Sequence, residues 1–207
     1  MISAYVDMSS ESKKNLSLLI IVISFVAFIY GTIKAMGIVE KTHVGTSNGI
    51  YRSYVTTSQE IQDKAVTLTA HCSNTLCEVQ NVLDFVTNIP YQTNTFQQYS
   101  AQKTIQQNFG DCDDKSNLLI SILHALGLEA YFVLVPKHIF IITAIEDQRL
   151  EKTKGLWVNG KKYFILESTA RNSKIGFPLH YKLDDIDVIV EPFSNEKLIF
   201  KQLEWKR

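Results

Sequence analysis

One cysteine in the sequence has surroundings that suit a nucleophile. Cys112 follows Gly110 and Asp111, and an apolar stripe with helical spacing begins a few residues later. Glycine permits a tight backbone turn, and aspartate is a common cap for the first turn of a helix. The thiol would therefore lie where unpaired backbone N–H groups and the positive end of the helix dipole stabilise a thiolate. The backbone amide of Cys112 could also donate a hydrogen bond to an oxyanion.

The acidic neighbours of Cys112 leave its role open. Most free cysteines are small, inert core residues, but this one is flanked by Asp111, Asp113 and Asp114. Their charges would raise the pKa of the thiol, so an active site needs a cationic partner that outweighs them. The same aspartates could bind a calcium ion that orders the loop, although helix capping accounts for Asp111 and Asp114 without any metal. We expect no cofactor.

The sequence around Cys112 closely resembles the nucleophile motif of bacterial transglutaminase-like proteins, a superfamily of cysteine peptidases. The matching residues are Gly110-Asp111-Cys112-Asp113-Asp114, Ser116, Leu118-Leu119, Leu123 and Ala125-Leu126-Gly127. In that family a cysteine opens a helix, and a histidine and then an acid come from successive strands of an antiparallel sheet. The resemblance, which covers about residues 59–169, implies a catalytic triad of Cys112, His138 and Glu167.

The resemblance places the base at His138, which follows Pro136-Lys137 and opens a strand-like stretch. A base is needed because a thiol attacks efficiently only when deprotonated, and an imidazole can accept that proton. Read without the resemblance, a lone histidine is more often a structural or exposed residue.

The third position departs from the family pattern. The family commonly has Asp shortly before Thr, whereas this chain has Glu167-Ser168-Thr169. A glutamate can still orient the imidazole and stabilise its cation, with a shift in geometry. The alternative acids are Asp184 and Asp185, and the remaining oxyanion donor could be any of three glutamines, Gln102, Gln106 and Gln107.

The elements that would position these residues form an α+β pattern, with helices first and antiparallel strands afterwards. We predict helices at residues 58–71, 76–87 and from 111 or 112 to Gly127, separated before the last one by a polar connection at 88–108. Ser58 suits an N-cap, and Thr75 with Glu78 has capping-box spacing. We predict strands at residues 130–135, 139–145, 156–158, 161–166, 187–190 and 197–203, with an Asn159-Gly160 hairpin turn. This is the papain-like or transglutaminase-like core that the resemblance implies.

An uncharged apolar run at residues 16–33 precedes the domain. About 18 such residues can cross the hydrocarbon core of a membrane. Lysines flank it almost evenly, so only the short N-terminal tail favours a cytoplasmic N-terminus and an extracytoplasmic domain. A cleaved signal peptide and a buried core helix are the alternatives. We predict a tail at 1–15, a transmembrane anchor at 16–36, a linker at 37–57 and the domain at 58–207.

The other two cysteines, Cys72 and Cys77, flank a predicted break between helices. In an oxidising compartment they could form a disulfide across that turn, or they could remain two buried thiols. A zinc site that combines them with Cys112 and His138 lacks the usual short paired spacing.

Composition narrows the classes of function. Among 207 residues, 21 Lys plus Arg balance 21 Asp plus Glu, so the chain lacks the basic excess that nucleic-acid binding requires. These features together predict a membrane-anchored thiol protease or amidase of the cell envelope, periplasmic or extracellular, which forms a thioester with a protein or peptide amide. Water as acceptor gives hydrolysis and an amine gives amide transfer. The alternative is a catalytically silent scaffold or binding module on the same fold.

Overall fold

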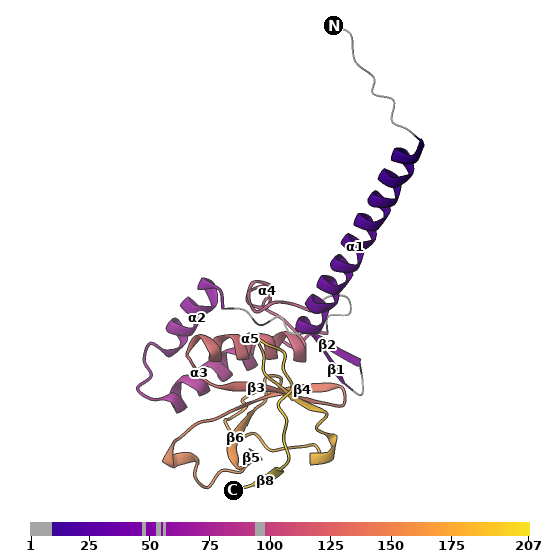
Figure 1. Cartoon of the computed structure of the whole chain (residues 1–207). Helices are drawn as coiled ribbons and strands as arrows, with labels where there is room; N and C mark the ends of the chain where they lie inside the picture. The colour runs from indigo at the N-terminus through magenta and orange to yellow at the C-terminus, as the bar shows by residue number, and fades with distance from the viewer. Residues whose placement is uncertain (1–9, 47–48, 53–54, 56, 94–97) are drawn as a thin grey trace. The chain divides into compact units, whose positions relative to one another are not determined.

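The computed structural model divides the chain into two units, one ending at Lys41 and the other running from Thr42 to Arg207 (Figure 1). It describes residues 10–46, 49–52, 55, 57–93 and 98–207. Residues 1–9 of the predicted tail and residues 47, 48, 53, 54 and 56 of the predicted linker lie outside this description.

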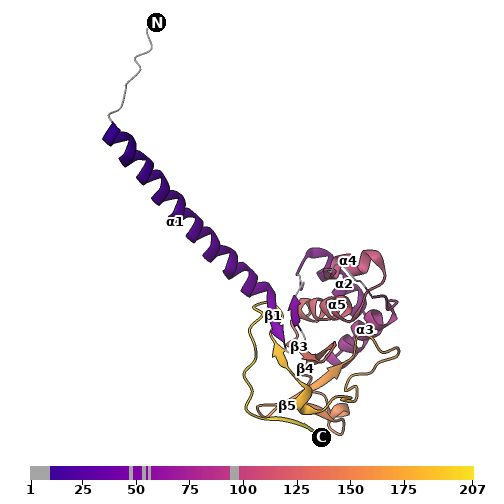
Figure 2. The ribbon, with the colours of Figure 1, turned by 90° about the vertical axis from the view of Figure 1, so that its right-hand side faces the viewer.

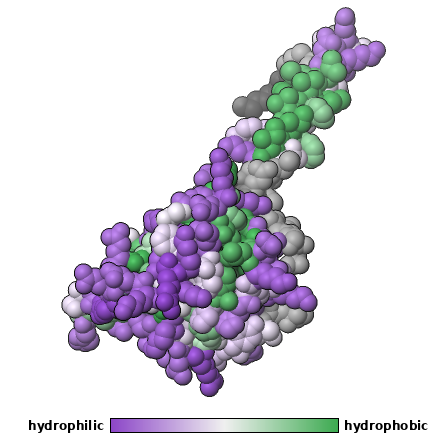
Figure 3. All heavy atoms as spheres, turned by 90° about the horizontal axis from the view of Figure 1, so that it is seen from below, coloured by the Kyte–Doolittle hydropathy of each residue, from purple (hydrophilic) through white to green (hydrophobic). Residues whose placement is uncertain are grey.

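The first unit contains a long apolar helix, α1 (Ser10–Thr42), which Figure 2 shows from the side. Its Ser10–Lys34 part is long enough to cross a membrane and contains an 18-residue window with a mean hydropathy of 2.5, none of which is buried within the protein. Figure 3 shows the hydrophobic side chains gathered along this helix. It is therefore not a core helix of the folded domain. A membrane anchor and a signal sequence both fit its length and composition.

Regular structure extends into the segment predicted as a linker. Helix α1 continues to Thr42, and strand β1 (His43–Thr46) then pairs antiparallel with β2 (Gly49–Arg52).

Four helices form one layer of the second unit. They are α2 (Gln59–Thr69), α3 (Thr75–Asn88), α4 (Ala101–Gln107) and α5 (Cys112–Ala125). The predicted cap at Ser58 is confirmed, because its hydroxyl accepts from the amide of Ile61. The Thr75–Glu78 capping box is wrong, since Asn74 caps α3 by accepting from the amide of Cys77. Helix α4 lies within the predicted polar connection.

A six-stranded sheet forms the other layer, in the order β7-β3-β4-β6-β5-β8, and every pairing is antiparallel. The strands are β3 (Ala130–Val135), β4 (His138–Thr143), β5 (Gly155–Val158), β6 (Lys161–Leu166), β7 (Val188–Val190) and β8 (Leu203–Lys206). The predicted Asn159-Gly160 turn is confirmed, with φ of 50° and 84°. The predicted strand at 197–203 is wrong: Lys197 forms a single bridge with Val190, and β8 begins only at Leu203.

Helix α5 is the centre of the hydrophobic core. Its apolar stripe is fully buried and packs against α2, α3, β3 and β4. In Figure 1, helices α2 to α5 lie together on one side of the sheet. Apolar side chains from residues 177–186 and 198–200 pack against the opposite face of the sheet. The α+β expectation of helices followed by an antiparallel sheet is therefore confirmed.

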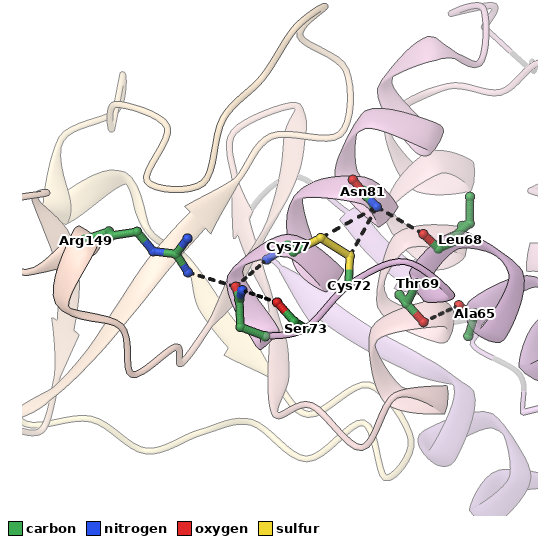
Figure 4. The surroundings of a disulfide bond; sticks show 9 residues. Ala65, Leu68, Thr69, Cys72, Ser73, Cys77, Asn81 and Arg149 are labelled. Carbon is green, nitrogen blue, oxygen red and sulfur yellow. Dashed lines mark hydrogen bonds between the residues drawn. A yellow bond between two sulfur atoms is a disulfide. The ribbon is translucent and has the colours of Figure 1, made fainter.

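The turn between α2 and α3 is closed by a disulfide between Cys72 and Cys77, whose Cα atoms are 5.4 Å apart (Figure 4). Asn81 donates a hydrogen bond to the carbonyl of Leu68 and contacts the Cys72 sulfur, which ties α3 back to the end of α2. Because both cysteines are in the disulfide, the zinc site considered from the sequence is wrong.

Replacing both cysteines of this disulfide, Cys72→Ala with Cys77→Ala, is expected to lower the free energy of unfolding by about 2 kcal/mol, the loop-closure entropy of so short a ring. Urea unfolding of the full chain in detergent measures the change. Dithiothreitol should lower the midpoint of the wild type and leave that of the double variant unchanged. Equal unfolding midpoints for wild type and the double variant, both without dithiothreitol, would contradict the prediction.

Candidate active site

Helix α5 begins with a reciprocal cap that fixes the position of Cys112. The Asp111 carboxylate accepts from the amides of Asp113 at 3.1 Å and Asp114 at 3.2 Å, and the Asp114 carboxylate accepts from the amide of Asp111 at 3.4 Å. Gly110 permits this arrangement, because a Cβ there would lie 2.8 Å from the Cβ of Asp114. The thiol is thus on the first residue of a rigid, buried helix, as predicted.

Asp114 is a structural residue. Its side chain is fully buried and also accepts from the amide of Tyr99 at 2.6 Å, and burial raises the pKa of this carboxyl to about 6. Within the described ranges, no group of three or more His, Cys, Asp or Glu side chains is arranged to hold a metal ion.

His138 and Glu167 lie at the same end of two neighbouring central strands. His138 opens β4 after a turn in which Lys137 has φ of 62°, and Glu167 follows the last residue of β6. The register pairs Ile141 of β4 with Leu166 of β6, so the two strands bring the imidazole and the carboxylate together. The His138 Nε2 to Glu167 Oε2 distance is 2.8 Å.

The carboxylate of Glu167 is fixed on its other side as well. Its Oε1 accepts from the backbone amide of Thr169 at 2.9 Å and from the Thr169 hydroxyl at 2.6 Å. Burial by itself would raise the pKa of Glu167, but the hydrogen bond and charge of His138 and the two Thr169 bonds lower it below its ordinary value. Glu167 is therefore a carboxylate at neutral pH and holds the imidazole through Nε2.

The thiol does not share a hydrogen bond with the imidazole in the part of the chain that the structure describes. Cys112 Sγ instead donates to Oδ1 of Asp113 at 3.6 Å. Burial, followed by the charges of Asp113 and Asp111, raises the pKa of the thiol to about 12. In this arrangement Cys112 is a protonated thiol.

Tyr181 is a further aromatic residue of the site. Its ring stacks on the imidazole of His138, with ring centroids 6.1 Å apart and planes inclined by 17°, and it stacks on Phe140 in a similar way. Burial and the charges of Glu167 and Cys112 raise the pKa of the Tyr181 phenol, which places it near both residues. Tyr181 therefore packs against the face of the His138 imidazole, whose Nε2 is bound by Glu167.

Two buried contacts connect α5 to the segments around it. The hydroxyls of Ser116 and Ser168 are 3.1 Å apart and join the helix that carries Cys112 to the residue after Glu167. Lys115 is buried, and its Nζ donates to the carbonyl of Ile89 at 2.8 Å. Burial lowers the pKa of Lys115 to about 8.

Among the described residues, neither of the alternative acids forms a hydrogen bond with His138. Asp184 and Asp185 lie in a short 3₁₀ helix, η2 (Leu183–Asp185), where Asp185 accepts from the amide of Lys182. Gln102, Gln106 and Gln107 are all on α4, and the last two are exposed. Sequence reasoning missed Gln98, whose Nε2 donates to Oδ2 of Asp113 at 2.7 Å, and it missed Tyr181. No sequence pattern marks either of them, because each reaches the site from a loop.

Part of the chain matches a known protein family. Residues 62–144 match the family model of the transglutaminase-like superfamily. A search of curated proteins gave no match. Among solved structures, the chain is similar to a candidate cysteine protease from Cytophaga hutchinsonii, with 21% identity, a TM-score of 0.43 and coverage of 56% of this chain and 39% of that one.

It is also similar to a candidate protease from Parabacteroides distasonis, with 14% identity, a TM-score of 0.45 and coverage of 69% of this chain and 28% of that one. The chain thus spans well under half the length of either structure. The segment that matches the family model includes Cys112 and His138 and ends before Glu167. Residues 62–144 of the chain are therefore similar to the transglutaminase-like superfamily.

Proposed function

We propose that the protein is a transglutaminase-like thiol hydrolase that cleaves a protein or peptide amide through a triad of Cys112, His138 and Glu167. The observation that supports this most directly is the 2.8 Å hydrogen bond between His138 and Glu167, in a chain whose Cys112 is the first residue of a buried helix. A buried carboxylate on the outer nitrogen of an imidazole is the arrangement that a catalytic base requires.

The hydrogen bond assigns a role to each ring nitrogen. With Nε2 donating to Glu167, the neutral imidazole presents an unprotonated Nδ1 that can take the thiol proton of Cys112. The sulfur then attacks the carbonyl carbon, and the amide of Cys112, which has no intrahelical acceptor, can donate to the oxyanion. The imidazolium returns its proton to the leaving amine, and a thioester of Cys112 remains.

Water then attacks the thioester, with His138 again taking a proton, and releases a carboxylic acid and the free thiol. An amine in place of water would give a new amide by the same steps. Hydrolysis is the reaction that we propose.

The proposed location is outside the cytoplasm. Helix α1 would anchor the chain as a single-pass membrane protein, with the N-terminus in the cytoplasm and the domain in the periplasmic or extracellular space. The disulfide between Cys72 and Cys77 supports this orientation, because disulfides persist in oxidising compartments and are rare in the cytosol. The proposed substrates are protein or peptide amides of the cell envelope.

The test is to trap the thioester. The full chain in detergent is incubated with a mixture of peptides, quenched in acid, and searched by mass spectrometry for an acyl group on Cys112. We expect an acyl adduct on wild-type Cys112 that hydroxylamine removes at neutral pH. Any adduct on the Cys112→Ser variant should resist this treatment, because hydroxylamine reacts with thioesters much faster than with oxygen esters.

A non-catalytic binding module is the second candidate, and the protonated Cys112 thiol, held by Asp113, is the observation that favours it. In that case peptides would bind and be recovered intact, and no acyl adduct would form on Cys112. Intact recovery with measurable binding would overturn the hydrolase proposal.

A further inference from the structure

The Asp113 carboxylate has a specific place in the site that the triad does not explain. One of its oxygens accepts the thiol hydrogen of Cys112, at 3.6 Å from Sγ, and the other accepts from Gln98 Nε2 at 2.7 Å. The carboxylate is thus held on both sides, by the nucleophile itself and by an amide from the segment before α4. Burial raises the pKa of Asp113 above its ordinary value, and the hydrogen bond from Gln98 and the charge of His138 offset this only in part.

The other polar side chains around the thiol form hydrogen bonds with other groups or are uncharged. The Asp111 carboxylate caps α5, and that of Glu167 binds His138 and Thr169. Tyr91 and Tyr181, from two different loops, present phenols whose pKa values are raised, first by burial and then by charges that include Cys112, so both are neutral at physiological pH.

We infer that Asp113 is a further residue of the reaction, one that contacts the reacting sulfur and keeps Cys112 a protonated thiol until His138 takes its proton. The inference rests on the proposed function for its role in turnover. Transfer of the proton to Nδ1 of His138 breaks the S–H···O hydrogen bond, so the carboxylate must turn away from the new thiolate or be screened from it by substrate. Gln98, which holds the second oxygen, opposes that movement.

The physical reason is electrostatic. A carboxylate next to a thiol stabilises the neutral S–H form through its hydrogen bond and repels the thiolate. An amide at the same position would have the same shape without the charge, and its N–H could donate to the thiolate instead.

The experiment measures the rate at which iodoacetamide alkylates Cys112 between pH 6 and 9, in the full chain in detergent. Cys112 is the free cysteine, because the other two form the disulfide. For Asp113→Asn we expect a rate about three- to tenfold above wild type at pH 7.5, since a lower thiol pKa raises the thiolate fraction more than it lowers the reactivity of each thiolate. The matched control is Asp63→Asn on α2, an exposed carboxylate that binds Gln59, which should leave the rate unchanged.

Gln98→Ala provides a second variant that keeps the carboxylate. It removes the hydrogen bond to Oδ2 of Asp113, so we expect a smaller increase in the alkylation rate than for Asp113→Asn. A rate for Asp113→Asn equal to or below that of wild type, in a variant with an unchanged unfolding midpoint, would overturn the inference. If Asp113→Asn unfolds at a lower midpoint than wild type, the alkylation rate of Gln98→Ala becomes the test. A Gln98→Ala rate no faster than that of wild type would then overturn the inference.

Alkylation does not require turnover, so the inference and the proposed function can fail separately. Faster alkylation of Asp113→Asn without any acyl adduct in wild type would retain the electrostatic role of Asp113 and remove the hydrolase. An acyl adduct in wild type, with an unchanged alkylation rate in Asp113→Asn, would support the hydrolase and remove the electrostatic role of Asp113.

Discussion

The Glu167→Gln variant is expected to lose about 10³- to 10⁴-fold in kcat/KM on the amide substrate, the loss typical of neutralising the acid of such a triad. Glutamine has nearly the same shape and can still accept the two hydrogen bonds from Thr169 through its oxygen. Its other terminal atom is then an N–H₂ donor facing His138 Nε2. Nε2 must accept, so the neutral imidazole carries its hydrogen on Nδ1 and cannot take the thiol proton of Cys112.

The matched controls separate charge from geometry. Glu167→Asp keeps the charge on a shorter side chain, so we expect a smaller loss than for glutamine. Asp185→Asn, at the alternative acid that bonds Lys182 instead of the imidazole, should retain wild-type kcat/KM. Wild-type activity in Glu167→Gln, or a comparable loss in Asp185→Asn, would remove Glu167 from the triad.

The titration of Glu167 sets where pH acts on the wild type. Its pKa is lowered from 4.5, so the carboxylate is ionised throughout the neutral range. Its contribution to stability and to orienting His138 is therefore present above pH 4.5 and is lost only as pH falls through the lower pKa of the folded state. A decline of activity between pH 5 and 8 must come from another group.

Local sequence signals account for the elements that were predicted correctly. Asp111 and Asp114 cap α5 through contacts within one helical turn, and Asn159-Gly160 forms a hairpin turn because both residues tolerate positive φ. The helix and strand that carry Cys112 and His138 follow from such short-range signals together with a long apolar stripe.

The wrong predictions concern segments whose structure depends on tertiary contacts. Helix α4 has only seven polar-rich residues and is stabilised by burial of Ala101 and Thr104 and by a cap at Ser100. Strand β8 lies at Leu203–Lys206, because it is there that the chain meets β5, with Trp205 opposite Leu156. The sequence near 197–203 is equally apolar, and only the distant partner selects the register.

The candidate site shows the same division. Cys112, His138 and Glu167 stand at predictable ends of elements, and the resemblance in sequence predicts them as the triad. Gln98 and Tyr181 reach the site from loops that the rest of the fold must position. The acidic cluster suggested a raised thiol pKa, but only the structure distinguishes Asp111 and Asp114, which cap the helix, from Asp113, which binds the thiol.

The His138→Ala variant is expected to lose amide cleavage by about 10³-fold or more, because removal of the base also removes the acid that protonates the leaving amine. The substitution leaves Glu167 buried without the partner that lowers its pKa. That carboxylate then destabilises the fold at neutral pH, so the unfolding midpoint must be measured alongside kcat/KM. His138→Gln, which can still donate to Glu167, keeps the carboxylate satisfied and should be equally inactive with a smaller change in midpoint.

The decisive comparison is the double variant His138→Ala with Glu167→Gln. If Glu167 acts through His138, its substitution should cost almost nothing further once the imidazole is absent, so the two losses in kcat/KM will not multiply. The second substitution should also recover stability, because it replaces a buried carboxylate that has lost its imidazole partner with a neutral amide. Losses that multiply would mean that Glu167 acts on substrate directly, and the hydrogen bond to His138 would then be structural.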